Sequence, residues 1–197
     1  MSISRDQILV SAAQVFRQKG YHGASMADIA EAVGLQKATL YHHFGSKQEI
    51  LAELLDRALD IVTENMTKAL ERGGSPEEKL KVAMRLYLQM LCEQGDLASV
   101  LLLEYRSLEK GLYTRHIQNR DKFEKMWRDL VREGVAAGKF QCESVSITVW
   151  AILGVMNWTI TWYRPEGKLS VENIADQFAD LFLEGMKSKR RSRRGQA

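Results

Sequence analysis

Residues 32–51 read AVGLQKATLYHHFGSKQEIL, and this stretch predicts short helices on either side of Gly34. The preceding helix, over 26–33, has a small apolar face, and glycine permits a sharp turn with a positive φ. A second helix is expected over 37–43. Two short helices joined by about three residues through a glycine are typical of a helix-turn-helix. Leu40 and Phe44 are four positions apart, so they share a helix face and are expected to reach a core.

The side chains left on the other faces of the second helix suit DNA. The hydroxyl of Tyr41 and the ammonium of Lys37 are good partners for phosphate oxygens, and His42 lies beside them. Ala38 and Thr39 are short enough to allow close approach to base edges and thymine methyl groups. The start of a helix itself attracts phosphate. We therefore expect a recognition helix in the major groove.

Serine marks other helix starts. Ser4, Ser46 and Ser75 each precede a Gln or Glu by three residues, a spacing that lets the two side chains satisfy free amides at the start of a helix. Only two prolines occur in 197 residues, and long segments follow a helical hydrophobic period. We expect an all-α protein with helices near 4–19, 26–33, 37–43, 47–72, 76–94, 97–109, 112–137, 143–163 and 170–186.

The composition is that of an ordinary globular protein, with 45% hydrophobic and 27% charged residues. The formal net charge is only +3, but residues 187–197 hold six lysines and arginines and no acid. This tail is expected to be disordered, either as a solvated tail or as an arm that adds non-specific affinity for DNA. Cys92 and Cys142 are expected to be free thiols in a reducing cytoplasm.

Residues 145–163 carry no charge, and this length is close to that of a bilayer span. The segment also contains serine, threonine and asparagine, which favours a buried central helix over a membrane span. The N-terminal MSISRDQILVSAAQVF is interrupted early by an acid and does not predict a signal peptide. We expect a cytoplasmic protein with no membrane partner.

The segment SMADIAEAVGLQKATLYHHFGSKQEIL, residues 25–51, closely resembles the DNA-binding signature of the TetR family of bacterial repressors. The resemblance covers about residues 5–55. It implies an all-α homodimer with an N-terminal three-helix helix-turn-helix domain and a C-terminal helical bundle for ligand binding and dimerisation. We place the DNA-binding domain at 1–50, the bundle at 51–186 and the tail at 187–197.

The same resemblance implies which residues meet DNA. Ser25 and Lys47, at the starts of two helices, would each hold a phosphate. Gln36 departs from the family pattern, which often has a capping serine or threonine there; it either reads adenine or makes a backbone or water contact. The residues placed at the DNA by the match are Lys37, Ala38, Thr39, Tyr41 and His42.

Residues 76–186 contain no HExxH, GxSxG or phosphate-loop glycine pattern and no His/Cys/carboxylate cluster. The sequence therefore predicts no enzyme, no metal site and no cofactor. Bulky side chains in this region form either a filled core or a plastic apolar ligand pocket. Asn157 needs a partner, either a ligand carbonyl or another group of the chain. The candidate ligand-binding residues are Met66, Met90, Trp127, Trp150, Asn157, Trp158 and Trp162.

A second, weaker resemblance concerns the effector. Parts of residues 101–140 and 154–178 look like the effector domain of TetR-type repressors of fatty-acid or sterol breakdown, which respond to acyl-CoA thioesters. It implies an acyl chain among the apolar helices and CoA phosphates near Arg106, Arg120 and Arg164. One alternative is a repressor of efflux or detoxification genes that responds to an apolar or cationic drug. Another is a DNA-binding module without an effector.

An apolar stripe near the C-terminus predicts a dimer surface. By the family resemblance, two helices from each subunit would form a four-helix interface. A two-fold dimer would place its recognition helices about 34–36 Å apart, one turn of DNA, and would bind a pseudo-palindrome. The candidate dimer residues are Ile174, Phe178, Leu181 and Phe182.

Overall fold

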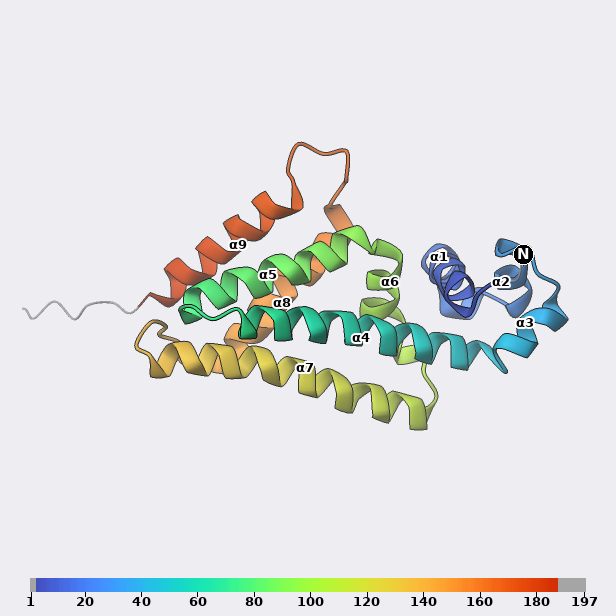
Figure 1. Ribbon diagram of the computed structural model, residues 1–197, viewed down its shortest axis with the longest axis horizontal. Coiled ribbons are helices and arrows are strands. Elements are labelled where there is room, and N and C mark those ends of the chain that lie inside the picture. Colours follow the sequence, from blue (N-terminus) through green and yellow to red (C-terminus); the bar gives the residue numbers. More distant parts are fainter. Residues whose placement is uncertain (1–2, 188–197) are drawn as a thin grey trace, which may run out of the picture.

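The computed structural model describes residues 3–187 as nine α-helices, with no β-strand in that range (Figure 1). The all-α prediction is therefore confirmed, whereas the predicted tail beyond Lys187 lies outside the described residues. The helices are α1 (Arg5–Gly23), α2 (Met26–Ala32), α3 (Lys37–His43), α4 (Lys47–Glu71), α5 (Pro76–Glu93), α6 (Gly95–Ser99), α7 (Lys110–Ala136), α8 (Val145–Trp162) and α9 (Val171–Met186).

Helices α1 to α3 form a small N-terminal unit. Ser4 and Ser25 begin α1 and α2 with complete capping boxes, as the serine spacing predicts for α1. Gly34 has a φ of 68° in the turn between α2 and α3, a conformation that favours glycine. Leu40 and Phe44 are both fully buried. The predicted helix-turn-helix and its core face are confirmed.

Helix α4 joins this unit to the rest of the chain, since it extends from the three short helices into the larger bundle (Figure 1). Its hydroxyl cap forms at Ser46, which accepts from the amide of Glu49. The carboxylate of Glu49 instead accepts from the amide of Gly45, at 2.8 Å. The capping box predicted at Ser46 is therefore only half formed.

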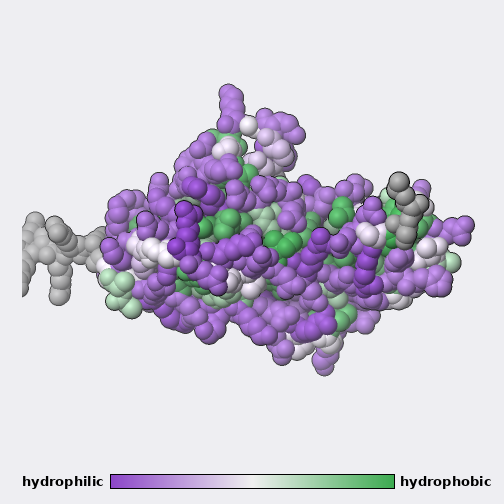
Figure 2. Space-filling model, viewed as in Figure 1, coloured by the Kyte–Doolittle hydropathy of each residue, from purple (hydrophilic) through white to green (hydrophobic). Residues whose placement is uncertain are grey.

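The C-terminal bundle is built around α5, which packs against α4, α7, α8 and α9. Ser75 caps α5 with a complete capping box, and Pro76 occupies its first turn. Leu80, Met84 and Leu88 of α5 are fully buried. The face of the molecule in Figure 2 is mostly hydrophilic with smaller apolar areas, because most large apolar side chains lie between the helices.

The prediction of a single helix over 97–109 is wrong. Helix α6 ends at Ser99 and continues as a π-helix over Val100–Glu104 and a 3-10 turn over Tyr105–Ser107. A π-helix holds one residue more per turn and is common at functional sites. The side chain of Gln48 on α4 then bonds both the carbonyl of Ser107, at 2.8 Å, and the amide of Glu109, at 3.0 Å.

Helix α8 is not the buried central helix that its composition predicts. It is apolar and long enough to cross a membrane by length and composition, but only 28% of it is buried. One face packs against α5 and α7. The opposite face is exposed in a single chain and consists of Ile147, Trp150, Ala151, Gly154, Trp158, Thr161 and Trp162.

Candidate DNA-binding surface and ligand cavity

Helix α3 presents a polar surface opposite its buried side. Lys37, Ala38, Tyr41 and His42 are exposed, and Thr39 is half-buried. The ammonium of Lys37 lies 5.9 Å from the centre of the Tyr41 ring, so the two candidate phosphate ligands are neighbours. The buried Leu40 fixes the helix from behind. The backbone thus turns five predicted DNA contacts outward together.

The helix starts predicted to meet phosphate differ in their local bonding. The Ser25 hydroxyl lies 2.6 Å from a carboxylate oxygen of Asp28 and accepts from the Asp28 amide at 3.1 Å. An ion pair with Lys19, together with the bonds from Ser25, holds the pKa of Asp28 well below its usual range. Gln36 makes no capping bond with its side chain, so its amide is exposed at the start of α3.

Lys47 points into the protein instead of extending freely from α4. Its ammonium donates to the carbonyl of Tyr21 at 2.7 Å and also to the carbonyl of Ala24. The Tyr21 ring centre is 4.3 Å away, close enough for a cation–π interaction. Two of the three ammonium donors are therefore used inside the DNA-binding unit, a role that the sequence did not reveal.

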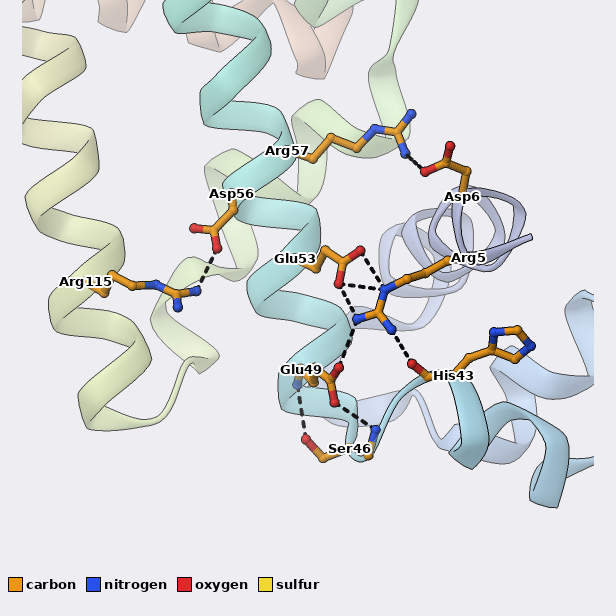
Figure 3. Close-up of polar contacts among 10 residues, drawn as sticks. Arg5, Asp6, His43, Ser46, Glu49, Glu53, Asp56, Arg57 and Arg115 are labelled. Atoms are coloured by element: carbon orange, nitrogen blue, oxygen red, sulfur yellow. Dashed lines mark hydrogen bonds and ion pairs between the residues drawn. The ribbon is translucent and has the colours of Figure 1, made fainter. Parts of the chain in front are cut away.

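Arg5 of α1 ties the end of α3 to α4 (Figure 3). Its guanidinium bonds Glu49 at 2.9 Å and Glu53 at 3.0 Å, and it also donates to the carbonyl of His43. The same group lies 3.9 Å from the centre of the Phe44 ring. The bond from Arg5 lowers the pKa of Glu49. Arg5 thereby satisfies a carbonyl at the C-terminus of the recognition helix.

Further ion pairs continue along α4, as Figure 3 shows. Arg57 pairs with Asp6 of α1 at 3.0 Å, and Asp56 pairs with Arg115 of α7 at 2.6 Å. These groups are partly exposed, so each pair is expected to contribute less than about 1 kcal/mol. Together they connect the first turn of α1 and the second turn of α7 to the same helix.

A cavity of about 460 Å3 lies in the C-terminal bundle between α4, α5, α7, α8 and the segment after α6. The volume is within the range of small-molecule sites. Its wall is mainly apolar, with polar groups contributed by α5, α7, α8 and Tyr105. The lining residues are Leu59, Val62, Tyr87, Leu101, Leu102, Leu103, Tyr105, Arg120, Phe123, Glu124, Trp150, Leu153, Gly154, Asn157, Trp158, Ile160 and Thr161.

The charged groups of this wall form one cluster around Glu124, whose side chain is only 14% exposed. Arg120 and Arg128 each approach its carboxylate, at 3.3 and 3.2 Å, and the indole N–H of Trp150 donates to it at 3.3 Å. Two guanidinium groups thus face one carboxylate. Arg128 lies outside the cavity lining, so the wall itself carries one arginine and one glutamate.

The structure brings four predicted ligand residues to the cavity, namely Arg120, Trp150, Asn157 and Trp158. Met66, Met90 and Trp127 are instead at most 2% exposed and belong to the packed core. Three further candidates are exposed on the surface and do not line the cavity, namely Arg106, Trp162 and Arg164. The filled-core interpretation therefore applies to the two methionines and to Trp127.

Tyr87, Tyr105 and the leucines of the π-helix line the cavity without having been predicted. Tyr87 looks like an ordinary member of the apolar stripe of α5, so periodicity gives no sign of its role. The three leucines 101–103 could only be placed once the π-helix was known. A run of consecutive apolar residues between two helices is the one signal that was available in the sequence.

The predicted dimer residues of α9 differ in how much of each side chain is exposed. Ile174 is only 3% exposed, because α9 packs against α5, and it has little surface left for a partner. Leu181 is 66% exposed, and Phe178 and Phe182 are half-buried. The larger apolar surface is on α8, where Trp150 and Trp158 are more than half exposed.

Within the described residues, no group of His, Cys and carboxylate side chains forms a candidate metal site.

An exposed helix-turn-helix and a separate helical bundle with a cavity define a transcriptional regulator with a DNA-binding unit and a ligand-binding type of domain. The sequence profile of bacterial regulatory proteins of the tetR family matches residues 8–54, and that of the tetracyclin repressor-like C-terminal domain matches residues 73–186. The chain belongs to the TetR family.

Individual relatives match over nearly the whole chain. The HTH-type transcriptional repressor KstR2 of Mycolicibacterium smegmatis is 29% identical, over 92% of this chain and 90% of the relative. PfmR, a TetR family regulator from Thermus thermophilus, is 37% identical with a TM-score of 0.85, over 93% of this chain and 100% of that one. AibR in complex with isovaleryl coenzyme A and operator DNA has the same fold, with a TM-score of 0.83 at 24% identity over 90% of this chain and 96% of that one.

Proposed function

We propose that this protein is a homodimeric repressor that binds a pseudo-palindromic operator and is released from it by a small apolar effector, an acyl-CoA. The observation that carries the proposal is the position of α4. Leu59 and Val62 of α4 form part of the cavity wall, while Lys47 at its first turn holds the DNA-binding unit. A ligand in the cavity therefore contacts the helix that supports the recognition helix.

The operator contacts are assigned to the exposed surface around α3. Lys37, Ala38, Thr39, Tyr41 and His42 would enter the major groove, with Gln36 at the start of the helix. Ser25 at the start of α2 would meet a phosphate. Lys47 would position this surface through its two carbonyl bonds more than it would contact DNA.

The dimer interface is assigned to the exposed faces of α8 and α9. An apolar surface with several exposed tryptophans is costly to leave in water. A two-fold contact would cover Trp150 and Trp158 together with Leu181, the most exposed of the α9 candidates. It would also close the edge of the cavity that these two tryptophans border.

The acyl-CoA assignment has support from the chemistry of the cavity. The apolar wall suits an alkyl chain, and the guanidinium of Arg120, which lines the cavity, is a suitable donor for a CoA phosphate. Fold similarity to AibR, which binds isovaleryl coenzyme A, points in the same direction. We also propose that the protein is located in the bacterial cytoplasm at the nucleoid, where operator DNA is found.

Release is proposed to be a shift between two populations of the dimer. A ligand displaces DNA only if it binds the two states with different affinity. The two ligands then oppose each other by one coupling free energy, typically about 1–3 kcal/mol. Gln48 of α4 bonds to Ser107 and Glu109, which directly follow the cavity-lining residues 101–105. These bonds are one direct contact between that segment and the start of α4.

A thermal-shift screen against acyl-CoAs, free CoA, free fatty acids and cationic drugs tests the effector. Binding to the folded state raises the melting temperature, so a rise confined to acyl-CoAs supports the proposal. Arg120→Ala should reduce that rise, and Arg132→Ala, which replaces an exposed arginine of α7 outside the cavity lining, is the matched control. A response only to drugs would favour an efflux-type repressor, and no response would favour a module without an effector.

Release is tested with duplex DNA selected by this protein from a random pool. Fluorescence anisotropy of the selected duplex should fall when the acyl-CoA that gives the largest thermal shift is added. Free CoA at the same concentration is the control. Unchanged anisotropy at saturating acyl-CoA would contradict the proposed release.

A further inference from the structure

Tyr87 of α5 and Asn157 of α8 meet in the cavity wall. The Tyr87 hydroxyl lies 2.7 Å from Oδ1 of Asn157, and both residues line the cavity. Tyr87 is only 4% exposed, and burial raises the pKa of its hydroxyl, which therefore keeps its proton. The amide oxygen of Asn157, within the most apolar helix, thus has a partner inside the protein.

This bond fixes the orientation of the Asn157 amide. The hydroxyl of Tyr87 has no other acceptor among residues 3–187, so it donates to Oδ1 of Asn157. Nδ2 then points away from Tyr87, because the oxygen and nitrogen of an amide lie on opposite sides of one carbon. No group in the described part of the chain accepts from Nδ2, and this atom is not enclosed by protein. Its two N–H donors therefore open on the cavity.

The other neutral donors of the cavity wall are either bonded within the protein or lie on its exposed side. The indole of Trp150 donates to a carboxylate at 3.3 Å, and the hydroxyl of Thr161 donates to a backbone carbonyl at 2.7 Å. The Tyr105 hydroxyl is bonded by the exposed Arg106, which places it toward solvent. The indole N–H of Trp158 also has no acceptor in the described part of the chain, but this side chain is 66% exposed. Asn157 is therefore left as the half-buried neutral donor in an apolar wall. A donor without an acceptor is costly when a ligand excludes water from it.

We infer that Asn157 is a specificity-determining residue, whose Nδ2 donates to a carbonyl oxygen on an otherwise apolar ligand, with Tyr87 holding the amide in that orientation. The effector class would then be defined by a carbonyl within or at the end of an alkyl body. For the acyl-CoA of the proposed function, on which this inference rests, the acceptor is the thioester oxygen.

Calorimetric titration with lauroyl-CoA and S-dodecyl-CoA tests the inference, because the two ligands differ only in the carbonyl oxygen. The wild-type protein should bind lauroyl-CoA about tenfold more tightly, the effect of one neutral hydrogen bond. Asn157→Asp retains an acceptor for Tyr87 but loses the amide donors, and it should abolish this preference. Tyr87→Phe retains the amide without its anchor and should reduce the preference only in part. Melting curves of both variants show whether each is folded.

The outcomes separate the inference from the proposed function. Equal binding of both CoA ligands to the wild type would overturn the inference and leave an acyl-CoA effector in place. If neither CoA ligand binds, the proposed effector is wrong, and decan-2-one and its isosteric hydrocarbon 2-methyldec-1-ene are titrated instead. A preference for the ketone that Asn157→Asp abolishes would support the carbonyl site by itself. No preference for the ketone would overturn it.

Discussion

Two lysines of the DNA-binding unit, ten residues apart, are placed in opposite ways. Lys37 is exposed beside Tyr41, whereas the ammonium of Lys47 bonds two backbone carbonyls. Replacing Lys47 by methionine leaves the carbonyls of Tyr21 and Ala24 without this donor. We expect Lys47→Met to lower the free energy of unfolding by about 1–3 kcal/mol. Urea denaturation measures this, and Lys37→Met, which should be close to neutral for stability, is the control.

The exposed side chains of α3 are expected to affect DNA binding and not stability. Tyr41→Phe should weaken binding to specific and random duplexes alike, because it removes a phosphate contact. Lys37→Ala should also relax base preference, since its position near the start of α3 allows a base contact. Competition titrations with selected and random duplexes measure both effects. An equal loss of specific and random binding for Lys37→Ala would contradict a base-reading role.

His116 should make stability depend on pH. It is 2% exposed, and neither ring nitrogen is bonded within the described chain. Burial, with the nearby Arg120 and Arg115, lowers its pKa to about 4. Between about pH 6.5 and 4 the unfolded chain binds a proton that the folded chain does not, so acid favours unfolding. The Tyr105 ring, 5.9 Å away between ring centres, covers one side of the imidazole.

His116→Phe removes the imidazole, so the unfolded variant no longer binds a proton at this position. The stability of the wild type relative to the variant should fall as the pH is lowered from 7 to 4.5, by up to about 3 kcal/mol. Urea denaturation at both pH values measures the change. A constant difference between the two proteins over this range would contradict the prediction.

At the level of helices, the exposed face of α8 is expected to form the dimer. Trp158 is 66% exposed on that face, and a charge there would be buried without a partner in a dimer. Trp158→Asp should give a protein with the mass of one chain in analytical ultracentrifugation. Val10→Asp, which replaces a 55% exposed apolar residue on α1, should leave the mass unchanged.

The helices that sequence predicts well are those with local signals. The serine caps and the turn at Gly34 depend on residues within about four positions of each other, so they can be recognised without the fold. Other features depend on neighbours that are distant in sequence. These are the π-helix after α6, the inward orientation of Lys47 and the exposure of one face of α8. Neighbours distant in sequence also decide that Trp150 and Trp158 line the cavity, whereas Trp127 on α7 packs against Tyr87 and Phe123.

For the whole molecule, the prediction concerns reciprocity. The factor by which acyl-CoA weakens DNA binding should equal the factor by which DNA weakens acyl-CoA binding, typically about 5–150-fold. Both dissociation constants can be measured with and without the second ligand. Gln48→Leu removes the bonds to the Ser107–Glu109 corner and should bring the factor closer to one. An unchanged factor in this variant would show that the coupling passes elsewhere.

The length of α4 makes it a mechanical lever. From Leu59 in the cavity wall to Lys47 the helix spans about 18 Å, at 1.5 Å per residue. A tilt of about 5° at the cavity displaces the far end by about 1.6 Å. In a symmetric pair the two displacements add to about 3 Å, which is close to the 3.4 Å rise of one base pair. A ligand that tilted α4 by this amount in the proposed dimer would change the spacing of the two recognition helices by nearly one step of the DNA.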